Sequence, residues 1–224
     1  KLKKIRILSR KSDLALIQAN QVGSIIKEKF SNIQVEYITK KTIGDKDLKT
    51  PLSEMKDVGV FTDDLRNDLI INKCDIAVHS WKDLPLDLGS ETILAGSLDR
   101  EDQRDILFIK KSSVEKIKMS KSVSIFSSSP RRIYNLEPFI KNYLPFDCNK
   151  IFFKNVRGNI PTRFRKFFNE DVDGLVVAKA AIDRLINCKM DIFRHLSLTI
   201  KKNINQCLWT ITPLSQNPTS PGQG

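Results

Sequence analysis

The stretch Ser122-Val-Ser-Ile-Phe-Ser-Ser-Ser-Pro-Arg-Arg132 decides the fold class of this chain. Ser122–Phe126 is expected to be a β-strand. Ser128 or Ser129 then caps a helix whose first position is Pro130, where a missing N–H group costs nothing. A strand followed directly by a capped helix is the repeating unit of α/β proteins. The stretch therefore predicts an α/β fold.

The same alternation of strands and helices continues on both sides of this stretch. Strands that alternate with helices imply parallel sheets with helices on both faces, and ligands of such sheets collect at the carboxyl ends of the strands. Residues 43–59 are expected to form a long polar loop. Further strands are expected at 3–9, 33–39, 74–79, 105–109, 151–154 and Gly174–Ala178, and helices after Ser12 to Phe30, at 61–71, 159–168 and 180–187.

The composition is that of a globular protein. Of 224 residues, 40% are hydrophobic and 29% charged, with 9 Gly and 9 Pro, which excludes a collagenous, low-complexity or disordered chain. No apolar run approaches the roughly 18 residues of a membrane span. The 4 cysteines form no CxxC pair and there are only 2 histidines, so we expect free thiols, no disulfide framework and no metal site.

Arginines are the most informative charged residues. Basic residues outnumber acidic ones by 38 to 26, a net charge of +12 that favours anionic partners. Most lysines are scattered, as on solvated faces. Several arginines instead lie beside turn or helix-start signals, and a guanidinium binds carboxylate or phosphate through paired hydrogen bonds. These arginines are Arg10, Arg131, Arg132, Arg157 and Arg163.

The segment from His79 to Asp83 follows a short apolar strand and contains the strongest catalytic candidate. In one interpretation Asp83 only caps a turn and Lys82 is a surface residue. In the other, Asp83 at the end of a strand holds a developing positive charge or a ring N–H while shielded from bulk water. Trp81 is either part of the core or a cover over a cleft.

Two strand-to-helix turns predict anion binding. Ser128 to Arg132 combines free N–H groups at a helix start with two hydroxyls and two guanidiniums, although a plain capped helix with two solvated arginines is the alternative. Arg157-Gly158-Asn159, followed by Arg163, forms a second turn in which Gly158 permits close backbone approach, or else only a turn. With Asp83, these turns predict a cleft for several anionic groups between two lobes.

Seven motifs follow one another along the whole chain in a specific order. They are Leu8-Ser9-Arg10-Lys11-Ser12, Thr42-Ile43-Gly44-Asp45, residues 75–85, residues 100–105, Ser128-Ser129-Pro130-Arg131-Arg132, Arg157-Gly158-Asn159 with Thr162-Arg163, and Gly222-Gln223-Gly224. In these residues the chain resembles the porphobilinogen deaminases, also called hydroxymethylbilane synthases.

The resemblance implies an enzyme, a transferase of heme and tetrapyrrole biosynthesis. The family condenses four porphobilinogen molecules head to tail, with release of ammonia, to give hydroxymethylbilane. By resemblance Asp83 is the catalytic residue, which contacts pyrrole N–H groups and steadies the cationic azafulvene formed when ammonia leaves. The residues that the resemblance assigns to the carboxylates of substrate and cofactor are Arg10, Ser12, Gln18, Lys82, Ser128, Ser129, Arg131, Arg132, Arg157, Arg163 and Arg184.

The resemblance also implies a domain organisation. Two lobes like those of type II periplasmic binding proteins are expected, residues 1–98 with 197–224 and residues 99–196, with parallel-rich sheets flanked by helices. In the family a small third α+β domain carries the cysteine that binds a dipyrromethane cofactor through a thioether. None of the four cysteines here matches that position, so the chain is expected to be truncated before that domain and inactive by itself.

Porphobilinogen is the expected partner, and neither nucleic acid nor a membrane is expected to bind. The protein is expected to be a monomer of the cytoplasm or a plastid-type organelle, not secreted. The residues alone, without the resemblance, leave two other functions open. A non-catalytic two-lobed organic-anion-binding protein would not need Asp83. Nucleic-acid binding is suggested by the charge of +12, but the chain has no zinc finger, aromatic ribonucleoprotein motif or contiguous basic helix.

Overall fold

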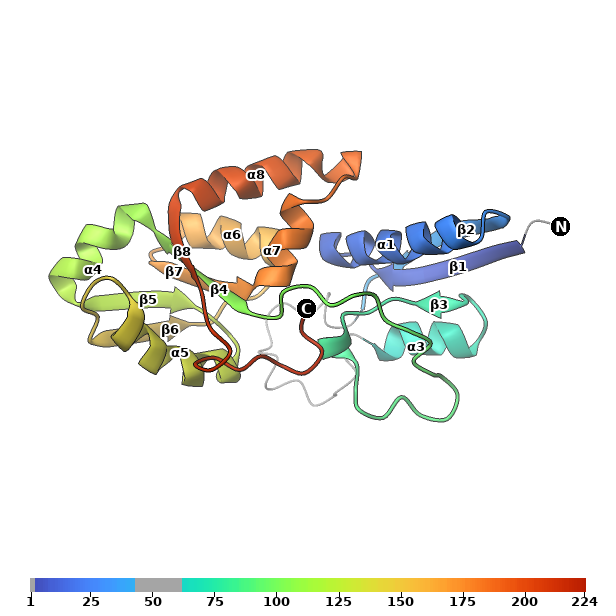
Figure 1. Ribbon diagram of the computed structural model, residues 1–224, viewed down its shortest axis with the longest axis horizontal. Helices are drawn as coiled ribbons and strands as arrows, with labels where there is room; N and C mark the ends of the chain where they lie inside the picture. Colours follow the sequence, from blue (N-terminus) through green and yellow to red (C-terminus); the bar gives the residue numbers. More distant parts are fainter. Residues whose placement is uncertain (1–2, 43–61) are drawn as a thin grey trace. The chain divides into compact units, whose positions relative to one another are not determined.

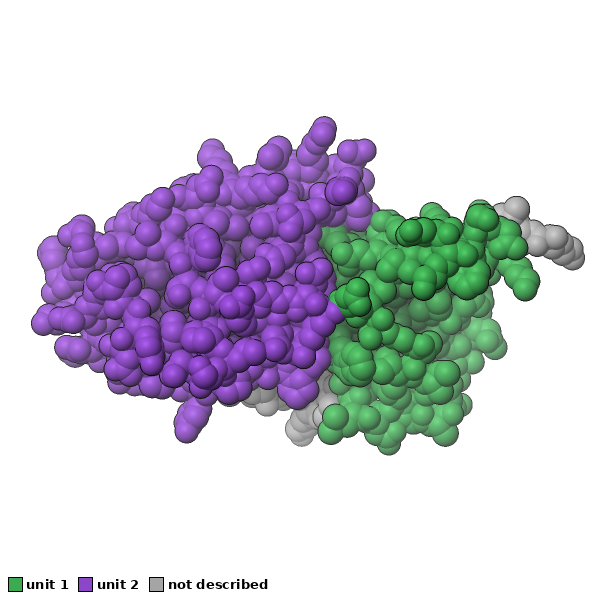
Figure 2. Space-filling model, in the orientation of Figure 1, with its two compact units in different colours: residues 1–99 green, residues 100–224 purple. Residues whose placement is uncertain are grey.

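The computed structural model describes residues 3–42 and 62–224 (Figure 1). The chain forms two compact units, Lys1–Asp99 and Arg100–Gly224 (Figure 2). Each unit has its own sheet and its own helices, which confirms the predicted α/β class. Residues 43–59, expected to be a loop, and Phe61, expected to begin a helix, lie outside the described residues. Within the described ranges no helix is both long and apolar enough to cross a membrane.

The first unit contains a three-stranded parallel sheet in the order β2-β1-β3. One face of the sheet packs on α1, where Gly23 lies against Tyr37 of β2. The other face packs on α3 through Leu8 and Leu65. Helices therefore cover both faces, as predicted. The elements are β1 Lys3–Arg10, α1 Asp13–Lys29, β2 Ile33–Lys40, α3 Asp63–Ile70, β3 Ile76–Ala77 and the 3-10 turn η2 Trp81–Asp83.

The second unit contains a five-stranded sheet in the order β6-β5-β7-β4-β8. Strand β5 pairs in parallel with β6 and β7, whereas β4 pairs antiparallel with β7 and β8. The strands are β4 Asp105–Lys110, β5 Ser122–Phe126, β6 Lys150–Lys154, β7 Gly174–Ala178 and β8 Cys207–Ile211, and the helices are α4 Val114–Ser120, α5 Pro130–Tyr143, α6 Ile160–Asn169, α7 Lys179–Ile186 and α8 Arg194–Asn205, with 3-10 turns η3 Lys111–Ser113 and η4 Asp191–Phe193.

Strand β4 departs from the expectation that strands alternating with helices are parallel, because it runs antiparallel to both β7 and β8. Strand β4 is buried at five of its six positions. An apolar run buried on both faces has the same pattern in either direction, so the sequence does not reveal its orientation. The direction of β4 determines where Asp105, its first residue, lies. Asp105 is opposite Ala178, the last residue of β7. Asp105 is therefore at the same edge as the carboxyl ends of the parallel strands.

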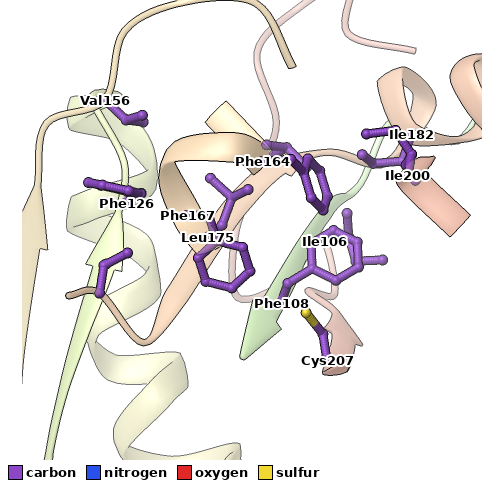
Figure 3. Packing of buried hydrophobic residues seen from close by; sticks show 12 residues of the cluster. Ile106, Phe108, Phe126, Val156, Phe164, Phe167, Leu175, Ile182, Ile200 and Cys207 are labelled. Atoms are coloured by element: carbon purple, nitrogen blue, oxygen red, sulfur yellow. The ribbon is translucent and has the colours of Figure 1, made fainter. Parts of the chain in front are cut away.

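Two hydrophobic layers hold the second unit together, one on each face of its sheet. On one face, Phe108 of β4 and Phe164 of α6 pack edge to face with ring centroids 5.5 Å apart, and Ile182 of α7 and Ile200 of α8 join them (Figure 3). On the other face, Leu107 and Ile109 of β4 pack against α4 and α5. Full burial of one such side chain stabilises the fold by about 1.5–3 kcal/mol.

Several elements differ from the sequence prediction. The strand expected at 74–79 is only Ile76–Ala77, although Asp75 N and Val78 N still donate to carbonyls of β1. Helices α4 and α8 and strand β8 were not predicted. Strand β8 pairs with β4 and belongs to the second unit, so the division into units differs from a first domain of 1–98 with 197–224. That domain division stays a prediction.

Candidate functional site

The candidate site of the first unit lies where parallel strands β1 and β3 end. Arg10 is the last residue of β1, and Asp83 closes the turn η2 that follows β3. The turn is held by the Asp83 N–H, which donates to the Ser80 carbonyl at 2.6 Å. Arg10 Nη1 lies 3.9 Å from Asp83 Oδ2, and the Asp83 side chain is 32% exposed. The fold therefore places a partly buried carboxylate beside a guanidinium at the ligand-binding edge of the sheet.

The surroundings of Asp83 change its proton affinity. Partial burial raises the pKa of Asp83, and the charges of Lys82 and Arg10 oppose this rise without cancelling it. Burial, aided by the charge of Arg10, lowers the pKa of His79 to about 4. Near neutral pH, His79 is therefore uncharged. Asp83 is a better proton acceptor than an ordinary aspartate.

The other candidates of the first unit differ in their surroundings. The Ser80 hydroxyl donates to Gln18 Oε1 at 3.1 Å, so Gln18 supports the loop that leads to Asp83. Ser12 stands at the N-cap of α1, but its hydroxyl makes no capping hydrogen bond. Lys82 is exposed. Trp81 is 50% exposed, which is inconsistent with a place in the core.

In the second unit, two guanidiniums share one buried carboxylate. Arg132 Nη2 donates to Asp105 Oδ1 at 2.8 Å, and Arg131 Nη2 donates to Asp105 Oδ2 at 2.9 Å. Asp105 is 0% exposed and Arg132 is 8% exposed. Burial alone would raise the pKa of Asp105, but Arg132, Arg131 and Gln223 together lower it to about 2. The alternative of a capped helix with two solvated arginines is therefore wrong for Arg132.

The two serines before α5 have different roles. Ser129 is the N-cap, and its Oγ accepts a hydrogen bond from the N–H of Arg132 at 3.4 Å. Ser128 does not cap the helix. Its hydroxyl donates to the carbonyl of Val156 and accepts from the N–H of Val156, both at 2.8 Å. Ser128 therefore ties together the two loops that carry the arginines.

The turn after β6 adds further cations. Arg157 precedes Gly158, whose φ of 109° lies in the region that favours glycine. Asn159 caps α6 by accepting from the N–H of Thr162 at 3.0 Å, and Arg163 Nε donates to the Gly158 carbonyl at 2.8 Å. Burial, with the charges of Arg132 and Arg157, lowers the pKa of Arg163 to about 10. Positive groups are thus crowded at this edge of the sheet.

Arg184 lies apart from this group in its contacts. It is in α7 and donates through Nη2 to the Gly224 carbonyl at 3.3 Å. Burial lowers its pKa, against the charges of Glu101 and Asp183. The structure thus brings together Arg10 with Asp83 in one unit and Arg131, Arg132, Arg157 and Arg163 in the other. That both groups surround one ligand stays a prediction.

A sequence model of a known protein family matches this chain. The family is described as porphobilinogen deaminase, dipyromethane cofactor binding domain, and the match covers residues 5–214. The chain belongs to the porphobilinogen deaminase family. This confirms the family resemblance of the seven motifs.

Individual porphobilinogen deaminases are similar over most of this chain. The enzyme of Syntrophomonas wolfei is 37% identical over 184 residues, which are 82% of this chain and 57% of that protein. The enzymes of Caldicellulosiruptor saccharolyticus and Chlorobium phaeovibrioides are 38% and 35% identical, with 82% of this chain covered and 60% and 56% of those proteins. This chain spans just over half the length of these relatives.

Solved structures with a similar arrangement have little sequence in common with this chain. A cysteine-to-serine mutant of the OxyR2 regulatory domain from Vibrio vulnificus is 13% identical with a TM-score of 0.41, covering 97% of this chain and 82% of that one. The alkanesulfonate-binding protein SsuA from Xanthomonas axonopodis pv. citri, bound to MOPS, is 13% identical with a TM-score of 0.36, covering 99% and 62%.

The residues of the second unit fit a dipyrromethane, the group named in the description of the family. A dipyrromethane with acetate and propionate side chains carries several carboxylates. The Nε atoms of Arg131 and Arg132 are buried without a hydrogen-bond partner, and Arg163 is crowded by other cations. Carboxylates would supply acceptors and relieve the crowding of positive charge. The arginines of this porphobilinogen deaminase domain are therefore suited to a group of that chemistry.

Sequence reasoning missed three residues of this site. Asp105 was treated only as the start of a strand, and Asn217 and Gln223, 0% and 2% exposed, were not considered as its partners. The sequence signal that could have found Asp105 is its acidic side chain at the boundary of an apolar strand. The sequence does not show that β4 runs antiparallel to β7, so it does not show that Asp105 lies at the edge of the arginine-bearing loops.

Proposed function

We propose that this chain is the catalytic and cofactor-binding part of a hydroxymethylbilane synthase. Such an enzyme joins four porphobilinogen molecules head to tail and releases ammonia. The observation that carries the proposal is the carboxylate of Asp83, which has a raised pKa and stands beside Arg10 at the end of the sheet. Family membership supports the same conclusion.

The proposed role of Asp83 follows from charge and proton affinity. Breaking the aminomethyl C–N bond of porphobilinogen releases ammonia and leaves a cation that is conjugated with the pyrrole ring. A nearby carboxylate stabilises this cation electrostatically. After a new carbon–carbon bond forms, the attacked pyrrole carbon must lose a proton, and a carboxylate with a raised pKa is a suitable acceptor. Arg10 is proposed to keep Asp83 oriented and to bind a substrate carboxylate.

The remaining candidates are proposed to bind carboxylates or to support groups that do. Dipyrromethane, when bound, supplies the pyrrole end from which the product chain grows, and we propose its covalent attachment to a cysteine of the complete protein through a thioether. The residues proposed to hold carboxylates of cofactor and substrate are Arg10, Ser12, Lys82, Ser129, Arg131, Arg132, Arg157, Arg163 and Arg184. Gln18 and Ser128 are proposed as supports, because their contacts are with neighbouring loops.

The test is turnover of porphobilinogen by the full-length protein and by Asp83→Asn. Ammonia release and tetrapyrrole absorbance are followed together. We expect turnover by the wild type and a loss of at least about 100-fold in Asp83→Asn, because a general base and electrostatic partner is removed. Asp87→Asn is the matched control, since Asp87 is an exposed carboxylate of the same loop region.

The outcomes separate the possible functions. A fully active Asp83→Asn protein would contradict the role of Asp83. Binding of porphobilinogen without ammonia release by the wild type would favour a non-catalytic organic-anion-binding protein. Mass spectrometry of the full-length protein is expected to show the added mass of a dipyrromethane, and an unmodified mass would contradict the cofactor assignment.

A further inference from the structure

Asp105 is the most completely hydrogen-bonded side chain of the second unit's site, and the proposed reaction gives it no part. It is the first residue of β4 and is fully buried. Because β4 runs antiparallel to β7, Asp105 lies opposite Ala178 at the edge where the arginine-bearing loops begin. Its position is therefore central to the cationic group rather than remote from it.

All acceptor positions of the Asp105 carboxylate are used. Oδ1 accepts from Arg132 Nη2 at 2.8 Å and from Gln223 Nε2 at 2.9 Å. Oδ2 accepts from Arg131 Nη2 at 2.9 Å and from Asn217 Nδ2 at 3.0 Å. A carboxylate has about four lone-pair sites, so each is matched by one donor. Two of the donors are cations and two are neutral amides.

This arrangement orders the two guanidiniums and leaves some of their N–H donors available for a ligand. Each guanidinium has five N–H donors and gives one of them to Asp105. Arg131 Nη1 also bonds Asn217 Oδ1 at 3.0 Å and the Pro218 carbonyl at 2.8 Å, which fixes the plane of that group. The Nε atoms of both arginines are buried without a partner. One negative charge is shared by two positive ones, so the pair keeps a net positive charge.

We propose that Asp105 is a positioning residue, which holds Arg131 and Arg132 in a fixed arrangement that receives the carboxylates of a pyrrole ligand. This inference rests on the proposed function and adds a residue to its site. A carboxylate that binds to pre-ordered guanidiniums does not have to restrict two flexible side chains, so its affinity is higher. The shared carboxylate also reduces the repulsion between the buried Arg132 and the half-buried Arg131 before the ligand arrives.

The variant Asp105→Asn distinguishes the effect of positioning the guanidiniums from the effect of electrostatic attraction on ligand binding. The substitution removes one negative charge, and by electrostatics alone the more positive site would bind an anionic ligand more tightly. Asparagine also replaces one carboxylate oxygen by an NH₂ group, which cannot accept a hydrogen bond. One of the two guanidiniums therefore loses its acceptor, and the two are no longer held by the same side chain. Positioning therefore predicts weaker binding in spite of the added positive charge.

The experiment compares full-length wild type, Asp105→Asn and Asp173→Asn. Asp173 is also a buried carboxylate of the second unit, but it pairs with Lys116 at 3.0 Å just before β7 begins, so its variant removes the same charge away from Arg131 and Arg132. Melting temperature, KM and kcat for porphobilinogen are measured where all three proteins are folded. We expect KM to rise at least about tenfold in Asp105→Asn and less than about twofold in Asp173→Asn, since lost ground-state binding appears in KM.

A second measurement is made on the wild type itself. Nitrogen-15 spectra of the ligand-free protein report whether the Nη groups of Arg131 and Arg132 are rigid, and Arg131→Lys and Arg132→Lys serve only to assign the signals. Separate, slowly exchanging Nη signals are expected. Averaged signals, or a KM in Asp105→Asn that is unchanged or lower, would overturn the inference. A wild type that does not turn over porphobilinogen would instead contradict the proposed function.

Discussion

Asp83 in the first unit and Asp105 in the second are both carboxylates beside two cations, yet their pKa values move in opposite directions. Asp83 has a guanidinium at 3.9 Å and is 32% exposed, and burial raises its pKa. Asp105 accepts four hydrogen bonds at 2.8–3.0 Å and has a pKa of about 2. The difference shows that cations close enough to donate hydrogen bonds outweigh the burial of Asp105, whereas the more distant Arg10 and the Lys82 charge do not outweigh the burial of Asp83.

The two sites accordingly divide their tasks. The folded-state pKa of Asp105 is depressed, so its contribution to stability is present above the unfolded value near 3.8 and is lost as the pH falls toward 2. Asp83, the proposed catalytic residue, instead has an ionic contact with Arg10 at 3.9 Å and a raised pKa. The two carboxylates thus differ in how closely their cations approach.

The largest expected effect is on the free energy of unfolding when the arginine beside each aspartate is replaced. Arg132→Leu leaves a fully buried carboxylate with fewer donors and is expected to lower the free energy of unfolding by about 3–5 kcal/mol. Arg10→Leu removes a long, partly exposed ion pair and is expected to cost less than about 1 kcal/mol. Urea unfolding followed through Trp209 reports the second unit, and unfolding followed through Trp81 reports the first. Equal losses of unfolding free energy in Arg132→Leu and Arg10→Leu would contradict the distinction between the two carboxylates.

A second prediction is the pH dependence of stability that His79, which lies in the same loop as Asp83, is expected to cause. The folded-state pKa of His79 is about 4, below the unfolded value of 6.5, so the unfolded state takes up the proton first as the pH falls. Stability is therefore expected to decrease between pH 6.5 and 4 by roughly 2 kcal/mol, and His79→Gln is expected to remove that decrease. His195→Gln changes an exposed histidine and serves as the control. An unchanged slope in His79→Gln would show that this region is well solvated.

The smallest expected effect is on the stability of Asp83→Asn. Because the folded-state pKa of Asp83 is raised, stability falls as the pH rises past the unfolded value near 3.8 through the folded value. The neutral variant lacks this loss and is expected to melt about 1 °C higher than wild type at pH 7, with the gain shrinking toward pH 4. Thermal unfolding at both pH values measures it. A lower melting temperature at pH 7 would mean that Arg10 stabilises the anion after all.

Much of the fold follows from local sequence signals. The strand Gly174–Ala178 is found as predicted, and Pro130 begins α5 after a serine cap. Asp83 and Arg10 are brought together at neighbouring strand ends, because the sheet of the first unit is parallel. Such features depend on residues close in sequence and on general rules of α/β sheets.

What could not be predicted depends on partners distant in sequence. The direction of β4 is set by pairing with β7 and β8, and an apolar run carries no mark of direction. Arg132 is buried only because Asp105 compensates its charge, so a local pattern of Ser-Pro-Arg-Arg does not distinguish it from a solvated arginine. The two serines before α5 likewise differ only through Val156, which belongs to another loop.

The donors around Asp105 also set an order of assembly. Asn217 and Gln223 lie 112 and 118 residues after the carboxylate they bind, whereas Arg131 and Arg132 follow it by 26 and 27. During synthesis at about 5–20 residues per second, the arginine pair emerges from the ribosome several seconds before the two amides. For that interval a nascent chain has both arginines that pair with Asp105 but not the two amides that complete the hydrogen bonding of its carboxylate.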